Sequence, residues 1–238
     1  MAFTLDRVVP WGRSFEEYVR MFDLTPADLQ KNILSCGDGP ASFNAEMNRQ
    51  GRRITSLDPI YRFSAPQIAE RITETRGVIL EQLRASREDY VWDTIGSPEE
   101  LGALRMSAMQ AFLADYPDGR REARYVAGEL PALPFADGQF DLALCSHLLF
   151  LYSEQLSLAF HQAAVAELWR VAREVRIFPL VTLAGGWSPH VEQVISSIEA
   201  LGGQATVVKV PYEFQRGGNE MLVIRRGAEG GLQIPKHY

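Results

Sequence analysis

Cysteine is scarce in this sequence, and neither sign of charge dominates it. The chain of 238 residues holds only Cys36 and Cys145, too few for a disulfide framework or a cysteine-based metal site. Its 24 basic and 30 acidic residues give a net charge of -6, which provides no attraction toward nucleic acid or an anionic membrane. We therefore expect a small-molecule substrate, no bound metal and two reduced thiols.

Long apolar segments are also missing. No apolar run approaches the roughly 20 residues that a bilayer-spanning helix needs. The opening residues, Met1 to Asp6, place an acid where a secretion signal is basic. These absences favour a cytoplasmic protein. The 46% hydrophobic content is nevertheless enough to bury a sizeable core.

Apolar runs and turn residues predict an alternation of strands and helices. The predicted strands are 33–36, 53–58, 123–127, 140–145, 174–180, 205–211 and 221–225. Helices are predicted after Ser14 and over 42–49, 157–171 and 191–201. Residues 65–116 have a helical pattern longer than one crossover needs, so we expect a helical insertion between the second and third strands. This predicts a single domain, 1–238, with an N-terminal helical segment at 1–31, the insertion at 65–122 and a terminal hairpin.

Two glycines follow the first predicted strand and open a helix. Gly37 and Gly39 lack a Cβ atom, so the loop can turn tightly and let a ligand approach its backbone. About 20 residues later, Asp58 ends the second strand, where its carboxylate can accept hydrogen bonds from both hydroxyls of a ribose. Ser42 stands where a dinucleotide site has its third glycine, so a nucleoside without a pyrophosphate fits better. The alternative is a tight turn without a ligand, with Asp58 capping the next turn.

A third motif lies between the third and fourth predicted strands, from Gly128 to Asp141. Its sequence, GELPALPFADGQFD, resembles the G-D-A-x-x-L-P-F-x-D-x-S-F-D stretch of class I S-adenosylmethionine-dependent methyltransferases. With the glycine loop and Asp58, the resemblance runs from about residue 33 to residue 178. It implies an α/β, Rossmann-like fold with a mainly parallel seven-stranded sheet and a C-terminal antiparallel hairpin strand.

The resemblance also implies a site for S-adenosylmethionine, whose demethylated product is S-adenosylhomocysteine. Glu129 matches the acid that meets the adenine amino group, and Leu130 matches the backbone contact to adenine. The first and fourth strands of the family's sheet are neighbours, which would bring the two cysteines together beneath the cofactor. The residues implied to bind the cofactor are Ser35, Cys36, Gly37, Asp38, Gly39, Asp58, Pro59, Glu129, Leu130, Cys145 and Ser146.

This sequence departs from the family's pattern in the glycine loop. Ser35 stands in place of the usual acid before the first glycine, and Ala41 in place of the third glycine. Asp38 either supplies the missing carboxylate for the cofactor's ammonium group or is an exposed loop acid. Arg13 and Tyr18 either close over the cofactor or, as the favoured interpretation, are a surface charge and a core aromatic. The segments 37–44 and 211–219 resemble a bacterial branch whose substrate is not identified.

The candidate acceptor site follows from a rule of sheet geometry. Ligands of open α/β sheets bind at the carboxyl ends of the strands, so residues that follow the strands are the candidates. The expected substrate contacts are Tyr61, Trp187, His190, Arg216 and Asn219. His147 and Tyr212 are the candidate catalytic residues, because an imidazole can take a proton from a hydroxyl or amine near neutral pH. For His147 the alternative is a packed histidine at a strand end.

These residues together predict an enzyme that transfers a methyl group from S-adenosylmethionine to a small-molecule acceptor, as a monomer or homodimer. One alternative is a non-catalytic S-adenosylmethionine-binding or scaffold protein, suggested by Ser35 and the lack of an unambiguous base. Another is a nicotinamide-dependent oxidoreductase, suggested by the βαβ unit and Asp58. Ser42 and the segment 129–135 argue against the oxidoreductase.

Overall fold

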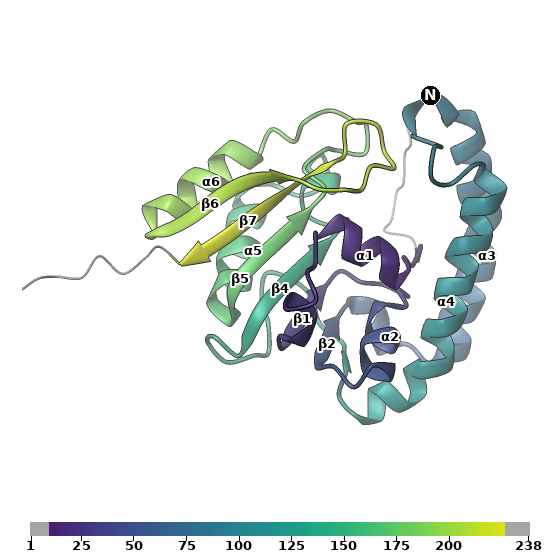
Figure 1. Cartoon of the computed structure of the whole chain (residues 1–238), viewed down its shortest axis with the longest axis horizontal. Coiled ribbons are helices and arrows are strands. Elements are labelled where there is room, and N and C mark those ends of the chain that lie inside the picture. The colour runs from purple at the N-terminus through teal and green to yellow at the C-terminus, as the bar shows by residue number, and fades with distance from the viewer. Residues whose placement is uncertain (1–9, 227–238) are drawn as a thin grey trace, which may run out of the picture.

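A seven-stranded sheet forms the centre of the computed structural model, which describes residues 10–226 (Figure 1). Its order is β3-β2-β1-β4-β5-β7-β6, and the neighbouring pairs are parallel except that β7 runs antiparallel to β5 and β6. The strands are β1 (Ile33–Cys36), β2 (Ile54–Leu57), β3 (Tyr125–Val126), β4 (Phe140–Ser146), β5 (Ala172–Phe178), β6 (Gly203–Lys209) and β7 (Glu220–Arg226). This arrangement confirms the fold that the family resemblance implied.

Helices cover both faces of the sheet. α5 (Leu158–Val171) and α6 (Val191–Ala200) pack on one face, and α1 (Phe15–Met21) and α2 (Phe43–Arg49) pack on the other (Figure 1). Successive strand residues point to opposite faces, so Leu34 joins the core under α5 and Ile33 joins the core under α1. Because both faces are buried, β1 and β4 are apolar along most of their length, as is typical of parallel sheets. Short 3-10 turns occur at Asp28–Gln30, Pro59–Arg62, Arg87–Asp89 and Phe150–Tyr152.

The predicted insertion is a pair of long helices. α3 (Ala65–Ala85) and α4 (Pro98–Arg121) pack together and stand beside α1 and α2 (Figure 1). We call this pair the arm. The Ser97 hydroxyl caps α4 by accepting a hydrogen bond from the Glu100 N–H at 3.1 Å. The base of the arm is fastened to the sheet by a cluster of packed rings, which are Tyr61, Phe112, Tyr116 and Tyr125.

The tip of the arm is joined to the loop between β6 and β7. The Val91 N–H donates to the Phe214 carbonyl at 2.7 Å, and the Arg216 N–H donates to the Asp89 carbonyl at 2.9 Å. The Tyr90 ring stacks on Phe214 with the ring centroids 4.8 Å apart. Since the base of the arm contacts β3 and its tip contacts the opposite end of the sheet, the arm spans the carboxyl ends of the strands.

Element bounds differ from the sequence-based expectations by small shifts. The expected helical stretch 65–116 is two helices, and the expected strand 174–180 begins earlier, because α5 ends at Val171 and β5 starts at the next residue. Residues 1–9 of the predicted N-terminal segment and residues 227–238 of the predicted domain lie outside the described residues. Within residues 10–226, none of the helices combines the length and apolarity that crossing a bilayer requires.

Candidate functional site

A cavity of about 930 Å³ lies where the carboxyl ends of the strands meet the arm. Its walls come from the glycine loop, from the loops that follow β2, β4 and β5, from the loop between β6 and β7, and from α3 and α4. Most of the wall is apolar, with a few charged groups among the apolar side chains, as in cavities that bind small molecules. The position is the one that the strand-end rule predicts.

Many of the residues singled out from the sequence lie in this wall. They are Cys36, Gly37, Asp38, Gly39, Asp58, Pro59, Glu129, Leu130, His147 and Tyr212. They come from segments that are distant in the chain, and the parallel sheet brings the ends of those segments to one edge.

The glycine loop needs glycine for two different reasons. Gly37 and Gly39 have φ angles of +73° and +52°, a left-handed conformation that other residues rarely adopt. A Cβ atom at Gly37 would also lie 3.1 Å from Leu148 Cβ, whereas a Cβ at Gly39 would meet no atom within 4 Å. From behind the loop, the Tyr61 hydroxyl donates to the Gly39 carbonyl at 2.8 Å. The loop is therefore fixed on its inner side and uncovered at Gly39.

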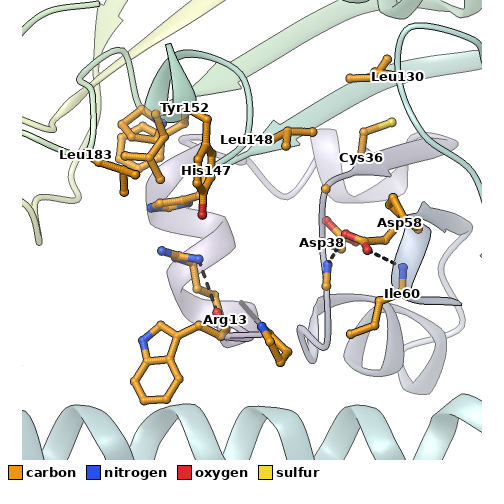
Figure 2. A pocket seen from close by; sticks show the side chains of 18 of the residues that line it. Arg13, Cys36, Asp38, Asp58, Ile60, Leu130, His147, Leu148, Tyr152 and Leu183 are labelled. Carbon is orange, nitrogen blue, oxygen red and sulfur yellow. Dashed lines mark hydrogen bonds between the residues drawn. The ribbon is translucent and has the colours of Figure 1, made fainter. Parts of the chain in front are cut away.

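Asp58 connects the end of β2 to this loop. One carboxylate oxygen accepts from the Gly39 N–H at 2.9 Å, and the other accepts from the Ile60 N–H at 2.9 Å. Burial raises the pKa of Asp58 to about 6, against the opposing effect of these two N–H donors. Each oxygen keeps a lone pair for a further donor. Figure 2 shows the carboxylate in the cavity wall, between Ile60 and Leu130.

Asp38 is a buried carboxylate and not an exposed loop acid. It accepts hydrogen bonds from the Tyr18 hydroxyl at 2.6 Å, from the Ser56 hydroxyl at 2.6 Å and from the Ser35 hydroxyl. Burial raises its pKa, and the three hydroxyls partly offset that effect. Tyr18 itself stacks on Phe43 in the core. Ser35, at the family's usual acidic position, thus donates to a carboxyl group placed three residues later.

The segment from Gly128 to Gln139 is held by two side chains of α5. The Glu167 carboxylate accepts from the Leu133 N–H at 2.8 Å. The Arg170 guanidinium donates to the Phe135 carbonyl at 3.0 Å and to Asp137 at 2.6 Å. These bonds fix the loop that carries the exposed Glu129 and the buried Leu130 at the cavity.

His147 has a backbone that non-glycine residues rarely adopt, with a φ of +49°. Its N–H donates to the Phe178 carbonyl at 2.7 Å, and its Nδ1 lies 3.0 Å from the Ser146 hydroxyl. Burial, together with the nearby Arg13 and Arg105, lowers the pKa of His147 well below its usual value. The ring is therefore neutral at pH 7. Unusual backbone conformations of this kind are concentrated at binding and catalytic sites.

Tyr212 lines the cavity with its ring but has its hydroxyl engaged elsewhere. The hydroxyl donates to Glu17 at 2.9 Å. Burial and the Glu17 carboxylate raise the pKa of Tyr212 to about 12. The phenol is thus neutral and is a poor proton acceptor.

Three of the expected cofactor contacts lie one layer behind the wall. Ser35 donates to Asp38, and the Ser146 hydroxyl contacts His147. Cys145 is paired in register with Cys36 across β1 and β4, as expected from the order of strands. None of the three lines the cavity.

The five residues expected to contact the substrate lie outside the cavity wall. Tyr61 is fully buried in the ring cluster, and Trp187 is 43% exposed at the surface. His190 packs against His161 with the ring centroids 4.6 Å apart. Arg216 donates to carbonyls of the arm tip, and Asn219 donates to Glu213. The strand-end rule locates a backbone position but does not determine where the side chain points.

Several wall residues were not predicted. The apolar run from Leu148 to Tyr152, directly after β4, supplies Leu148, Leu151 and Tyr152, and the strand-end rule could have selected it. Arg105 comes from the middle of α4, is 1% exposed and is paired with Glu17. No sequence pattern marks it, because a single arginine in a helix is ordinarily a surface residue.

No cluster of three or more histidine, cysteine, aspartate or glutamate side chains with the geometry of a metal site occurs within residues 10–226.

Comparison with known proteins gives a matching family model and a relative of similar length. A family model described as a methyltransferase domain matches residues 97–175, from α4 into β5. The uncharacterized protein MJ0045 of Methanocaldococcus jannaschii is 34% identical over 216 residues, which cover 90% of this chain and 95% of that protein. This relative is archaeal, and the resemblance to a bacterial branch stays a prediction.

Solved structures are similar at low sequence identity. A putative S-adenosylmethionine-dependent methyltransferase of Methanococcus maripaludis is 12% identical, with a TM-score of 0.46 over 92% of this chain and 85% of that one. The magnesium protoporphyrin IX methyltransferase of Synechocystis is 11% identical, with a TM-score of 0.43 over 84% of this chain and 73% of that one. The fold assignment rests on the strand order described above.

Proposed function

We propose that this chain, which belongs to the family of MJ0045, is a class I S-adenosylmethionine-dependent methyltransferase that transfers a methyl group from S-adenosylmethionine to a small-molecule acceptor. The observation that carries this proposal is the contact between the glycine loop and Asp58, at 2.9 Å, in the wall of the cavity. This contact places the sterically uncovered backbone of Gly39 and the free lone pairs of the Asp58 carboxylate in the wall of one cavity.

The residues present fit such a cofactor. Asp58 would accept from the ribose hydroxyls, and Ile60 and Leu130 offer apolar surfaces on either side of it (Figure 2). Glu129 would accept from the adenine amino group. The volume of about 930 Å³ is large enough for a nucleoside cofactor together with an acceptor.

The cofactor supplies a methyl group activated by a sulfonium, and the protein's task is alignment. Holding two reactants in the right orientation can lower the reaction barrier by roughly 7–11 kcal/mol relative to their free collision in solution. The apolar wall formed by Leu148, Leu151 and Tyr152 would exclude water and orient the acceptor. His147, whose pKa is lowered well below its usual value, is a weak base, so its neutral ring would orient an acceptor hydroxyl or amine by a hydrogen bond. The ring of Tyr212 would position the acceptor, since its hydroxyl is held by Glu17.

Asp58→Asn is expected to weaken S-adenosylhomocysteine binding about tenfold, because a hydrogen bond to a charged group contributes about 1.5 kcal/mol or more. Isothermal titration calorimetry measures this change. Asp141→Asn is the matched control, because Asp141 also accepts from a backbone N–H, that of Asn32 at 3.0 Å, but lies outside the cavity wall. An equal effect of both substitutions would contradict the role of Asp58.

Turnover is a separate measurement. Formation of S-adenosylhomocysteine from S-adenosylmethionine should be followed with panels of hydroxyl, amine, thiol and carboxylate acceptors. Product formation with one class supports the enzyme. Saturable binding without any product would instead support the non-catalytic binding protein, and the absence of saturable binding by the wild-type chain would exclude both.

Cofactor affinity is expected to fall in acid because of Asp58. Its pKa in the folded protein is raised to about 6, and the hydroxyls of a ribose bind the ionised carboxylate. Protonation therefore competes with binding below pH 6, so the dissociation constant for S-adenosylhomocysteine should be about tenfold higher at pH 5 than at pH 8. Calorimetry across this range tests the expectation. The affinity of Asp58→Asn should vary much less with pH. If this variant shows the same pH profile as the wild type, the pH dependence belongs to another group.

A further inference from the structure

Arg13 lies in the cavity wall and is held there by its own backbone. The preceding Gly12 packs so closely on the glycine loop that a Cβ atom would lie 2.0 Å from the Pro40 carbonyl oxygen. The Ser42 N–H donates to the Arg13 carbonyl at 3.0 Å. From this anchored position the side chain extends into the cavity toward His147 (Figure 2).

The guanidinium of Arg13 lacks an acidic partner. Its one hydrogen bond within residues 10–226 is a long one, from Nη1 to the Trp11 carbonyl at 3.4 Å. Its Nε is buried and has no hydrogen-bond partner among the described residues. The Arg13 side chain as a whole is half-buried in the cavity wall, and a guanidinium there without a carboxylate partner is free to bind an anionic group of a ligand.

The nearby carboxylates are already engaged by other donors. Glu17 accepts from the Ser14 N–H at 3.0 Å, from the Tyr212 hydroxyl at 2.9 Å and from the Arg105 guanidinium. Asp38 is bound by three hydroxyls, and Asp58 by two backbone N–H groups. None of them forms an ion pair with Arg13.

Arg105, in contrast to Arg13, has a carboxylate partner. It pairs with Glu17, so that carboxylate is engaged, and Arg13 has no carboxylate partner among the described residues. Burial would raise the pKa of Glu17, but Arg105 outweighs that effect and holds it at about 2, so the carboxylate is ionised. The Nε of Arg105, a residue that is 1% exposed, also has no partner among the described residues. Arg13 is therefore free to bind a negatively charged group of a ligand.

We propose that Arg13, supported by Arg105, binds a carboxylate of a ligand in this cavity. A carboxylate matches the charge and the planar fork of an unpaired guanidinium. Given the proposed function, on which the identity of the ligand rests, this carboxylate belongs either to the amino-acid end of the cofactor or to the acceptor. Because the arm lines the adjacent wall with Ile79, Leu83 and Tyr90, an acceptor held this way would be an apolar carboxylic acid.

Binding measurements with paired probes test the proposal and separate the two sources. The wild-type chain and Arg13→Gln are titrated with S-adenosylhomocysteine and with 5′-methylthioadenosine, which lacks the amino-acid carboxylate. Both are also titrated, with S-adenosylhomocysteine present, with octanoate and with the uncharged octanamide. Arg71→Gln is the matched control, because Arg71 also lines the cavity but already pairs with Glu74 at 3.0 Å.

Two results support the proposal. If Arg13→Gln weakens S-adenosylhomocysteine tenfold or more and leaves 5′-methylthioadenosine unchanged, Arg13 binds the cofactor's carboxylate. If it weakens octanoate tenfold or more and leaves octanamide and both nucleosides unchanged, Arg13 binds the acceptor. In either case Arg71→Gln should behave like the wild type.

Two results overturn it. Either Arg13→Gln binds every probe as the wild type does, or it weakens charged and uncharged probes equally, which indicates a general distortion of the cavity. Failure of the wild-type chain to bind either nucleoside would reject the proposed function without deciding the role of Arg13, which the octanoate pair then tests alone.

Discussion

Gly37→Ala is expected to lower the affinity for S-adenosylhomocysteine about a hundredfold, a loss of about 2.7 kcal/mol. A side chain at φ +73° costs about 1–2 kcal/mol. In addition, the new methyl group would lie 3.1 Å from both Cβ and Cδ2 of Leu148, so that wall residue or the loop must shift. Both changes act where the backbone would meet the cofactor. Calorimetric titration of the purified variant measures the loss.

Gly51→Ala is the control that separates the cost of a side chain on a left-handed backbone from the loss of cofactor binding. Gly51 also has a left-handed backbone, at φ +70°, but a Cβ atom there meets nothing within 4 Å, and it lies outside the cavity wall. Urea unfolding should show a similar loss of stability in both variants, whereas only Gly37→Ala should lose affinity. If the two variants bind S-adenosylhomocysteine equally well, the loop does not contact the cofactor.

Glu17→Gln is expected to lower the free energy of unfolding by about 3–5 kcal/mol, because it leaves the charge of Arg105 buried without its partner. The glutamine can still accept from the Ser14 N–H or the Tyr212 hydroxyl, so the loss reports mainly on charge. It should be measured by urea unfolding at pH 7. A loss of this size is a large part of the stability of a typical domain.

A surface pair provides the control for Glu17. Glu99 pairs with Arg84 at 2.8 Å, with the two side chains 61% and 53% exposed, so Glu99→Gln should leave the stability nearly unchanged. The acid dependence gives a second readout. Since the folded pKa of Glu17 is depressed to about 2, its contribution is present above the unfolded value of about 4.5 and is lost as the pH falls toward 2. Equal losses in both variants, or unchanged acid sensitivity in Glu17→Gln, would contradict a buried ion pair.

The architecture could be predicted because its signals are local. Runs such as Ile33 to Cys36 and Phe140 to Cys145 are continuously apolar, as strands covered on both faces must be. Glycines mark the turn after β1, and serines mark the starts of helices. The position of the cavity followed from the rule that parallel strands present their carboxyl ends at one edge.

The direction of individual side chains could not be predicted in the same way. Tyr61 follows β2 as expected but turns inward, because its ring completes the cluster at the base of the arm. Arg216 lies in the expected loop but donates to the arm tip. Both outcomes depend on the arm, and the sequence indicates its helices without indicating what they pack against.

Pairing between charges that are distant in the chain also could not be predicted from the sequence. Arg105 and Glu17 are 88 residues apart in the chain, and neither stands out from the ordinary charges of an amphipathic helix. Only the docking of α4 beside α1 makes them a buried pair. That Arg13 has no carboxylate partner is visible only after this pair is known, since Arg105 engages Glu17.

Cys36 and Cys145 are paired in register across β1 and β4, so the reactivity of these thiols can report on the opening of the central sheet. Burial raises the pKa of Cys145 to about 12 and that of Cys36 well above its usual value, so neither thiol forms appreciable thiolate in the native state. The chain contains no other cysteine. Cys145, unlike Cys36, does not line the cavity. Its reaction with a thiol reagent at neutral pH therefore requires the central strands to become accessible, and the rate of that reaction measures how often the sheet opens beneath the glycine loop.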